Sequence, residues 1–210
     1  MTTRRRELPA AKRERLAQVD DPQVVLDAAL RFLETRQRSV AEVRRRLGHA
    51  GYRGELVEGA IERLLALGIL DDEAFAAAWV ASRDRASPRG EHVLMLELRQ
   101  KGIDPAIVSA TLVARREAAA TWDGEAGDAA DPGEPEEPPA TPDEAGARRL
   151  LARHARALER VADPRVRRQR AYALLARKGF GPDVASAISR EWLAGAAVAD
   201  GAEGPGEDGA

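Results

Sequence analysis

The chain has 210 residues, enough for one or two domains with a sizeable core, and a net charge of −2 that argues at first sight against a polyanionic partner. Only 4% of the residues are aromatic and cysteine is absent, which disfavours a β-sandwich or β-barrel and excludes disulfides and thiolate metal sites. The apolar residues form no run long enough to span a membrane, and the N-terminus has no apolar signal segment, so we expect an all-α, cytoplasmic protein without membrane contact.

Residues 1–20 hold six basic and three acidic side chains, and we predict that they form a flexible basic arm. Apolar residues then recur at the helical period. They predict helices over 22–36, 40–49, 55–67, 72–85, 89–101, 105–118, 143–161, 164–178 and 182–194. Asp can cap a helix and Pro fits its first turn, and such pairs open three of these helices: Asp21-Pro22, Asp104-Pro105 and Asp163-Pro164. Ser39 and Glu42 have the spacing of a capping box.

An internal repeat organises these helices. A Leu, three residues, a Gly and a bulky apolar residue recur as Leu47-Gly51-Tyr52, Leu98-Gly102-Ile103 and Leu175-Gly179-Phe180. Each Gly stands where a helix can end in the left-handed conformation, close to a Schellman arrangement. The sequence therefore predicts three three-helix repeats, at 21–68 (first repeat), 69–118 (second repeat) and 143–195 (third repeat).

The distribution of charge along the chain reverses the inference, drawn from the net charge of −2, that a polyanionic partner is disfavoured. Residues 119–147 hold nine acidic and no basic side chains, whereas residues 148–195 hold 12 basic and four acidic ones. Repeated Pro, Gly and acidic residues predict a disordered linker at 119–142 and a disordered acidic tail at 196–210. The basic third repeat favours an anionic partner, and the tethered acidic linker is one candidate competitor for it.

Several spaced motifs in the first two repeats resemble the RecX family of bacterial regulators of the RecA recombinase. The most specific string is Leu70-Asp71-Asp72-Glu73-Ala74-Phe75-Ala76, followed by Arg83, Gly90, Leu98, Lys101, Gly102 and Ile103. The first repeat carries a second group: Ala29, Leu30, Leu33, Arg36, Arg38, Ser39, Glu42, Leu47 and Tyr52. The resemblance covers 26–118 well and 146–193 more loosely.

The resemblance implies an elongated array of helix-turn-helix-like repeats that binds in the groove of the RecA filament on DNA. It also implies inhibition of the ATPase and of strand exchange, which would tune recombination, DNA repair and the SOS response. Val43 and Arg46 depart from the family's usual Leu and Lys.

Basic residues are the candidate contacts with RecA or with DNA. Arg149, Arg153, Arg156 and Arg160 recur at spacings of four, three and four, which places them on one helical stripe. The other candidates are Arg44, Arg45, Arg46, Arg165, Arg167, Arg168, Arg170, Arg177 and Lys178. The alternative for each is an ordinary solvated surface, and the sequence does not separate an acidic RecA surface from single- or double-stranded DNA as the anion.

Catalytic patterns find no support in the sequence, which predicts no enzyme, cofactor or metal site. It contains no Walker-type glycine loop and no closely spaced histidine pair. Asp71, Asp72 and Glu73 fit a helix cap better than a Mg²⁺ site. Phe75 and Trp79 fit a core better than a base-stacking platform, and His154 fits a core or boundary position.

Two further functions stay open. A Gly-containing turn between short helices outlines a helix-turn-helix DNA reader, although 55–67 and 105–118 offer few outward Arg, Asn or Gln for base contacts. A generic helical-repeat scaffold would bind a protein without any dependence on DNA. For the RecA-directed function we expect a monomer.

Overall fold

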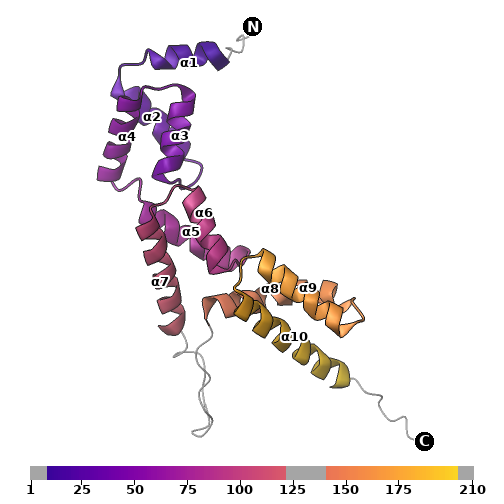
Figure 1. The fold of residues 1–210 in the computed structure, drawn as a ribbon. Helices are drawn as coiled ribbons and strands as arrows, with labels where there is room; N and C mark the ends of the chain where they lie inside the picture. The colour runs from indigo at the N-terminus through magenta and orange to yellow at the C-terminus, as the bar shows by residue number, and fades with distance from the viewer. Residues whose placement is uncertain (1–8, 122–140, 203–210) are drawn as a thin grey trace, which may run out of the picture. The chain divides into compact units, whose positions relative to one another are not determined.

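The computed structural model describes residues 9–121 and 141–202, and within them every regular element is an α-helix (Figure 1). The all-α prediction is confirmed. The helices are α1 (Pro9–Ala17), α2 (Pro22–Leu33), α3 (Val40–Ala50), α4 (Gly54–Ala66), α5 (Asp72–Ala86), α6 (Glu91–Gln100), α7 (Pro105–Thr121), α8 (Pro142–Glu159), α9 (Pro164–Arg177) and α10 (Pro182–Ala202). Among the described helices, none has the length and apolarity needed to cross a membrane.

All nine predicted helices are present, and α1 is an addition. It lies in the stretch predicted as a flexible arm, and it is held in place because Leu16 is buried. The backbone of Arg13 also approaches the turn after α3 so closely that a Cβ at Gly51 would lie 2.8 Å from the Arg13 carbonyl oxygen. Helix α10 continues to Ala202, beyond the predicted end at residue 194. Most of the predicted linker, 122–140, and the end of the predicted tail, 203–210, lie outside the described residues.

The predicted caps and turns are confirmed in detail. Asp21 and Asp163 accept hydrogen bonds from the N–H groups two residues later, and Ser39 and Glu42 form both bonds of a capping box. The three repeat glycines have positive φ angles, with values of 109° at Gly51, 79° at Gly102 and 85° at Gly179. The apolar residue after each donates its N–H to the Leu carbonyl five residues earlier, as a Schellman motif requires: Tyr52 to Leu47, Ile103 to Leu98 and Phe180 to Leu175.

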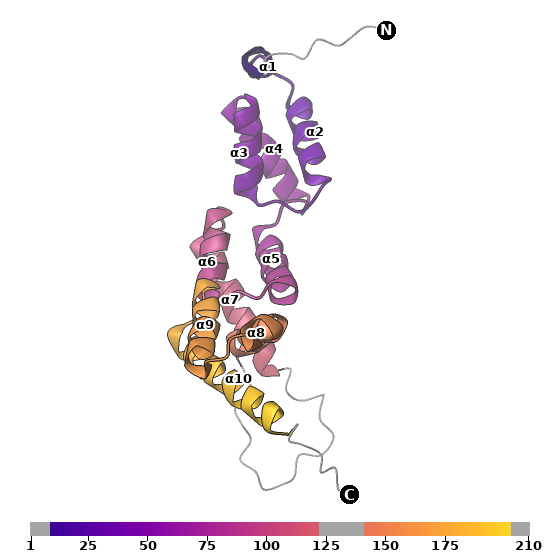
Figure 2. The ribbon, with the colours of Figure 1, turned by 90° about the vertical axis from the view of Figure 1, so that its right-hand side faces the viewer.

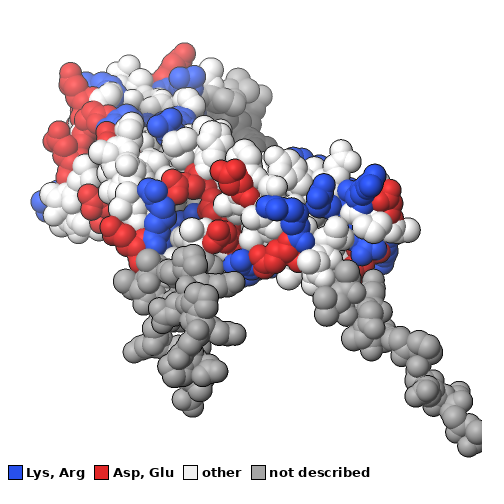
Figure 3. Space-filling model, turned by 60° about the horizontal axis from the view of Figure 1, so that its bottom comes forward, with Lys and Arg blue, Asp and Glu red and all other residues white. Residues whose placement is uncertain are grey.

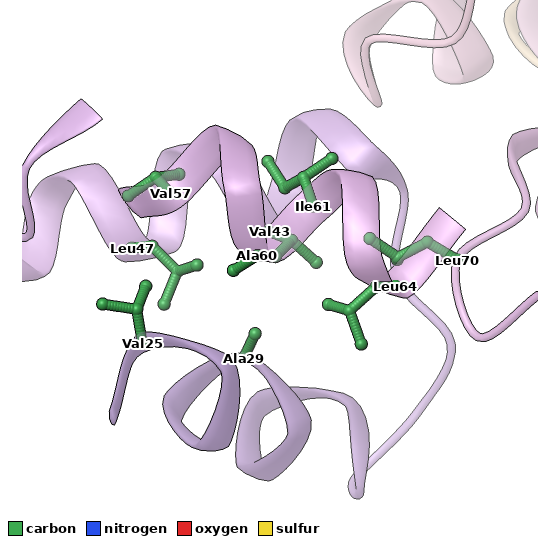
Figure 4. Packing of buried hydrophobic residues seen from close by; sticks show 9 residues of the cluster. All are labelled: Val25, Ala29, Val43, Leu47, Val57, Ala60, Ile61, Leu64 and Leu70. Atoms are coloured by element: carbon green, nitrogen blue, oxygen red, sulfur yellow. The ribbon is translucent and has the colours of Figure 1, made fainter. Parts of the chain in front are cut away.

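The chain divides into two compact units. The described residues up to 78, with 98–108, form the N-terminal unit, and the described residues among 79–97 and from 109 onward form the C-terminal unit. In the N-terminal unit, α2, α3 and α4 pack on one another around a buried cluster (Figures 1 and 4). The cluster consists of Val25, Ala29, Val43, Leu47, Val57, Ala60, Ile61, Leu64 and Leu70. Each large side chain buried there contributes about 1.5–3 kcal/mol, so this cluster is the main source of stability for the first repeat.

In the C-terminal unit, α8, α9 and α10 pack on one another in the same way (Figure 2). Their buried cluster consists of Ala147, Leu150, Leu151, Leu158, Ala171, Leu175, Phe180, Ala185 and Ile188. Leu175 and Phe180, which flank the third repeat glycine, both belong to it. The turn that was recognised in the sequence is therefore anchored in the core.

Each of the first two repeats receives the turn of the next repeat at the N-terminus of its own second helix. In the N-terminal unit, the Ser39 hydroxyl donates to the carbonyl oxygen of Lys101 at 2.6 Å. In the C-terminal unit, the Gly90 N–H donates to the carbonyl oxygen of Lys178 at 3.0 Å. Ser39 and Gly90 each precede their repeat glycine by twelve residues, and Lys101 and Lys178 each come directly before one. The two contacts therefore lie at equivalent positions of the repeats, although the donor is a hydroxyl in one and a backbone N–H in the other.

A second contact repeats at both junctions and uses a carboxylate. The Val40 N–H at the start of α3 donates to Oδ1 of Asp72 at 2.9 Å. The Glu91 N–H at the start of α6 donates to Oδ2 of Asp143 at 3.0 Å. In both cases an acidic residue from the beginning of the next repeat satisfies an N–H group that a helix N-terminus leaves without an intrahelical partner.

The repeat glycines permit the close approach of these segments. A Cβ at Gly102 would lie 2.3 Å from the Cβ of Ala41, and a Cβ at Gly179 would lie 2.3 Å from a methyl group of Val93. At the second junction Gly90 faces Gly179, and a Cβ on Gly90 would lie 2.1 Å from the Gly179 carbonyl oxygen. Both junctions therefore need a glycine in the arriving turn, and the second needs a glycine in the receiving helix as well.

Candidate functional site

A cleft with a volume of about 620 Å³ lies between α9 and α10. Three arginines and one tyrosine give the cleft its chemistry. Its lining residues are Pro164, Arg165, Arg168, Gln169, Tyr172, Ser186, Ser189, Arg190 and Leu193. Arg165, Arg168 and Tyr172 share one face of α9 because their spacings of three and four match the helical period.

The cleft is positively charged. Three guanidinium groups line it, and none of the described residues that line it is acidic. Arg190 is anchored at one point, since its Nε donates to the carbonyl oxygen of Ser186 at 3.2 Å. The nearby carboxylate of Asp163 is engaged as the N-cap of α9, where it accepts the N–H of Arg165 at 2.8 Å. Tyr172 is 38% exposed, so part of its ring is open to a ligand.

The predicted arginine stripe on α8 is exposed along its length, but its members differ in what they do. Arg153 donates to the carbonyl oxygens of Arg85 and Ala86 at 2.9 and 2.7 Å, which satisfies acceptors at the C-terminus of α5. Arg153 is therefore a structural contact. Arg149, Arg156 and Arg160 form no ion pair within the described residues. On the face drawn in Figure 3, basic side chains gather over the part of the molecule that contains α8–α10.

The remaining basic residues of α9 also divide into two groups. The Nε of Arg167 donates to the carbonyl oxygen of Val161 at 2.9 Å, which fixes the connection between α8 and α9. Arg170 and Arg177 are exposed. Burial, followed by the positive charges of Arg89 and Arg177, lowers the pKa of Lys178 below its ordinary value. The cleft arginines Arg165 and Arg168 remain the predicted residues of α9 that line a concave site.

In the N-terminal unit, the predicted residues Arg44, Arg45 and Arg46 are all exposed on α3. Arg44 forms a two-point ion pair with Glu58 at 2.7 and 2.8 Å, and this contact raises the pKa of Arg44 and lowers that of Glu58. Arg46 lies over the Phe32 ring, with its guanidinium carbon 5.7 Å from the ring centre. Arg44 is thus engaged within the fold, whereas Arg45 is exposed and has no ion pair within the described residues.

Arg38 was not among the basic residues that the sequence predicted as contacts with a partner. Its guanidinium carbon lies 4.2 Å from the centre of the Phe32 ring, and its Nε is buried without a hydrogen-bond partner in the described structure. Burial, and then the positive charge of Arg36 and of Arg46, lowers the pKa of Arg38. The pairing of Arg36 and Arg38 just before the Ser39 cap was the available sequence signal.

The acidic run at the start of the second repeat acts as a helix cap, as expected. The carboxylate of Asp71 accepts the Ala74 N–H at 2.9 Å, and Asp72 binds α3 as described above. No group of three possible metal ligands occurs among the described residues. Burial, only partly offset by the hydrogen bond from Val40, raises the pKa of Asp72.

The sequence predicted core or boundary positions for Phe75, Trp79 and His154, and the structure places the three side chains differently. Phe75 is buried, as predicted. Trp79 is half-buried and donates its indole N–H to Glu97 at 2.8 Å, while Arg83 lies 4.4 Å above its ring. The prediction for His154 is wrong, because its side chain is exposed and reaches only the carbonyl oxygen of Leu150 on its own helix.

Comparison with known proteins places this geometry in a family. Models of the first, second and third three-helix domains of RecX match residues 26–64, 71–112 and 143–188, in that order along the chain. The chain belongs to the RecX family. The resemblance inferred from the motifs is confirmed, and the three repeats correspond to the three RecX domains.

Relatives named regulatory protein RecX share part of the chain. The protein from Mycobacterium sp. strain JLS is 40% identical over 83 residues, which are 40% of this chain and 45% of that protein. The protein from Mycolicibacterium smegmatis is 36% identical over 106 residues, which are 49% of this chain and 56% of that protein. The chain thus spans about half the length of the curated relatives it matches.

A crystal structure of RecX from Lactobacillus salivarius is similar in fold, with a TM-score of 0.62 at 22% identity. The similarity covers 82% of this chain and 96% of that one. A second crystal structure, of a regulatory protein RecX, has a TM-score of 0.61 at 21% identity over 88% of this chain and 79% of that chain. These similarities support the helical-repeat fold.

Proposed function

We propose that this RecX-family chain is a negative regulator of the RecA recombinase that binds in the groove of the RecA filament on DNA. It inhibits the ATPase and strand exchange, and it thereby tunes recombination, DNA repair and the SOS response. The observation that carries this proposal is the ordered match of all three RecX domains, together with relatives named regulatory proteins. The chain acts by binding and performs no catalysis of its own.

The partner is the RecA filament, and its DNA is a second target for the basic third repeat. Arg149, Arg156 and Arg160 are suited to an acidic protein surface or to phosphates because they are exposed and lack internal ion pairs within the described residues. Arg45 offers a further basic contact from the first repeat. The chain works as a monomer in the cytoplasm, where the DNA-bound filament forms, and light scattering of the purified protein tests the monomeric state.

The charge of α4, one of the two candidate recognition helices, argues against the helix-turn-helix alternative. In α4, the exposed positions include the acidic residues Glu55, Glu58 and Glu62 against a single basic one, Arg63. A helix with this surface would be repelled by the phosphates that border a DNA groove. The RecA-directed function fits the described charges better.

The test is an ATPase assay of a bacterial RecA on single-stranded DNA, with increasing amounts of the chain. We expect hydrolysis to fall as the chain approaches stoichiometry with RecA. Unchanged hydrolysis at stoichiometric excess would reject the proposed function. A protein that bound RecA equally well with and without DNA, and left hydrolysis unchanged, would instead be the generic scaffold.

Charge reversal locates the contact. A triple variant, Arg149→Glu, Arg156→Glu and Arg160→Glu, should weaken the inhibition, whereas Arg153 is left intact because it caps α5. The matched control reverses three exposed arginines outside the candidate surfaces: Arg63, Arg85 and Arg99. Equal inhibition by the two triple variants would remove the α8 stripe from the contact surface.

A further inference from the structure

Helix α1 lies over the end of the first repeat that carries its glycine turn (Figures 1 and 2). At the two later turns, a Cβ on Gly102 or Gly179 would overlap a side chain in the first turn of the receiving helix. At the first turn, a Cβ on Gly51 would lie 2.8 Å from the carbonyl oxygen and 3.0 Å from the Cα of Arg13, in the middle of α1. Helix α1 therefore takes the place that the second helix of a preceding repeat would occupy.

The exposure of its residues gives α1 the character of a terminal cap. Among residues 10–17 only Leu16 is buried, and all the others are exposed. The exposed residues include four charged ones: Lys12, Arg13, Glu14 and Arg15. The terminal elements of repeat arrays need such a polar outer face, because an uncovered end exposes the surface that would bind a neighbouring repeat.

The third repeat closes the array by different means. Twelve residues before its glycine, where Ser39 and Gly90 bind the next repeat, the third repeat has Arg167. This position lies inside α9, and its N–H donates to the carbonyl oxygen of Asp163 at 2.9 Å. The receiving ends of the first and second repeats already hold the second and third turns. Among the described residues, no receiving end is therefore left free for the turn of another chain.

We propose that α1 is the N-terminal cap of the repeat array and that the turn it covers, at Gly51, is a latent surface for association with a second copy of this chain. Two uncovered turns pack against each other about a two-fold axis, because a head-to-tail contact would need a free receiving end. A two-fold contact of this kind closes at two chains.

The charge beside the turn is compatible with such a contact. Arg53, two residues after Gly51, is paired with Asp20 within the same chain. Two copies that face each other at this turn are therefore not repelled by their Arg53 side chains. The inference goes beyond the proposed regulation of RecA because it concerns this chain alone.

The test detaches α1 in the full chain and measures the mass of the particle by sedimentation velocity at increasing protein concentration. Leu16→Glu places a charge in the apolar contact of α1, so this variant should form dimers as the concentration rises, whereas the parent should stay monomeric. The control, Ala11→Glu, adds the same charge at an exposed position of α1 and should also stay monomeric. A monomeric Leu16→Glu chain, equal dimerisation of both variants, polymers larger than a dimer, or a parent that dimerises would each overturn the proposal.

Amide hydrogen exchange separates loss of the cap from loss of the fold. Leu16→Glu should raise the exchange rates in α1 at least about tenfold, the factor expected for the loss of one buried leucine, and should leave α4 and α9 protected. Unchanged exchange in α1 would mean that Leu16 does not anchor the helix. Loss of protection throughout α4 would mean that α1 belongs to the core of the first repeat and is not a cap.

A chemical cross-link locates the contact, because the chain contains no cysteine of its own. In the Leu16→Glu background, His49→Cys places a thiol at an exposed position two residues before Gly51, where a short bismaleimide should link two chains. Glu73→Cys, at an exposed position of α5, should give no linked dimer. Equal linkage from both thiols, or none from His49→Cys, would show that the chains do not meet at the first turn.

Discussion

The two junctions between repeats bind the equivalent lysine carbonyl oxygen of the arriving turn, through the Ser39 hydroxyl at the first and the Gly90 N–H at the second, and different side chains stabilise them. Side chains stabilise the first junction. Ser39 caps α3 and binds the Lys101 carbonyl, and the Lys101 ammonium pairs with Glu42 at 2.7 Å. At the second, a glycine replaces Ser39, and a buried arginine, Arg115, binds two carboxylates nearby. A repeat protein can thus keep one docking geometry while the interactions that stabilise it change from one junction to the next.

At the second junction, one arginine side chain, that of Arg115, holds two carboxylates. Only 6% of the Arg115 side chain is exposed, and it binds Asp84 at 2.8 Å and Asp143 at 2.7 Å. Burial would lower the pKa of Arg115, but the hydrogen bonds to Asp84 and Asp143 outweigh it and raise the pKa. Asp143 also accepts the Glu91 N–H, so one carboxylate serves both the arginine and the start of α6.

The largest expected effect is therefore at Arg115. Arg115→Ala should lower the free energy of unfolding by about 3–5 kcal/mol, because it leaves two partly buried carboxylates without their cation. Urea denaturation followed by circular dichroism measures this loss. The neighbouring Arg116 is 56% exposed, and Arg116→Ala should cost less than about 1 kcal/mol. Similar losses in the two variants would show that the second junction does not depend on Arg115.

A reciprocal exchange of the two receiving residues should give the next largest effect. Gly90→Ser should cost at least about 3 kcal/mol, because the new Cβ would lie 2.1 Å from the Gly179 carbonyl oxygen and would force the backbone there to shift. Ser39→Gly should cost only about 1–2 kcal/mol, for the lost hydroxyl contacts. Thermal unfolding and amide exchange in α9 and in α3 measure the two effects separately.

Gly181→Ala is the control for the glycine exchange, since a Cβ there meets no atom within 4 Å. It should leave stability within about 0.5 kcal/mol of the parent. If Gly90→Ser and Ser39→Gly cost the same, the two receiving positions are interchangeable and the asymmetry between the junctions is wrong.

Local features could be predicted from the sequence because their determinants lie within a few residues. The Ser39 capping box, the Asp-Pro starts and the three Schellman turns each depend on residues at most five positions apart. The long-range contacts could not be predicted in this way. Ser39 and Lys101 are 62 residues apart, and Val40 and Asp72 are 32 apart, so neither partner signals the other.

The candidate surfaces show the same division. The spacing of Arg165 and Arg168 in the sequence predicts that they share one face of α9. Tyr172 lies at the next position on that face and could have been predicted as a third lining residue in the same way. Arg190 lies on another helix, so only the packing of α9 and α10 brings it to the site. Arg153 fits the α8 stripe by its spacing, yet its partners are the carbonyls that end α5.

The smallest expected effect is the pH dependence of the first junction. Burial works against ionisation of Glu42, but hydrogen bonds from Lys101 and from the Ser39 N–H lower its pKa below the ordinary value. A carboxyl whose folded pKa is lowered contributes stability that is fully present above its unfolded pKa and is lost as the pH falls through the folded pKa. Asp72 has a raised pKa, so its protonation as the pH falls favours the folded state. Acid should therefore change the contributions of Glu42 and Asp72 to stability in opposite directions.

Glu42→Gln should therefore cost about 1 kcal/mol near neutral pH, and this difference from the parent should shrink as the pH falls below the ordinary range of glutamate. Urea denaturation at a series of pH values between about 7 and 3 measures it. Glu62→Gln, at an exposed position on α4, is the matched control and should differ little from the parent throughout. A Glu42→Gln difference that stays constant down to the lowest pH would mean that packing of the side chain, and not its charge, holds Lys101 at the first junction.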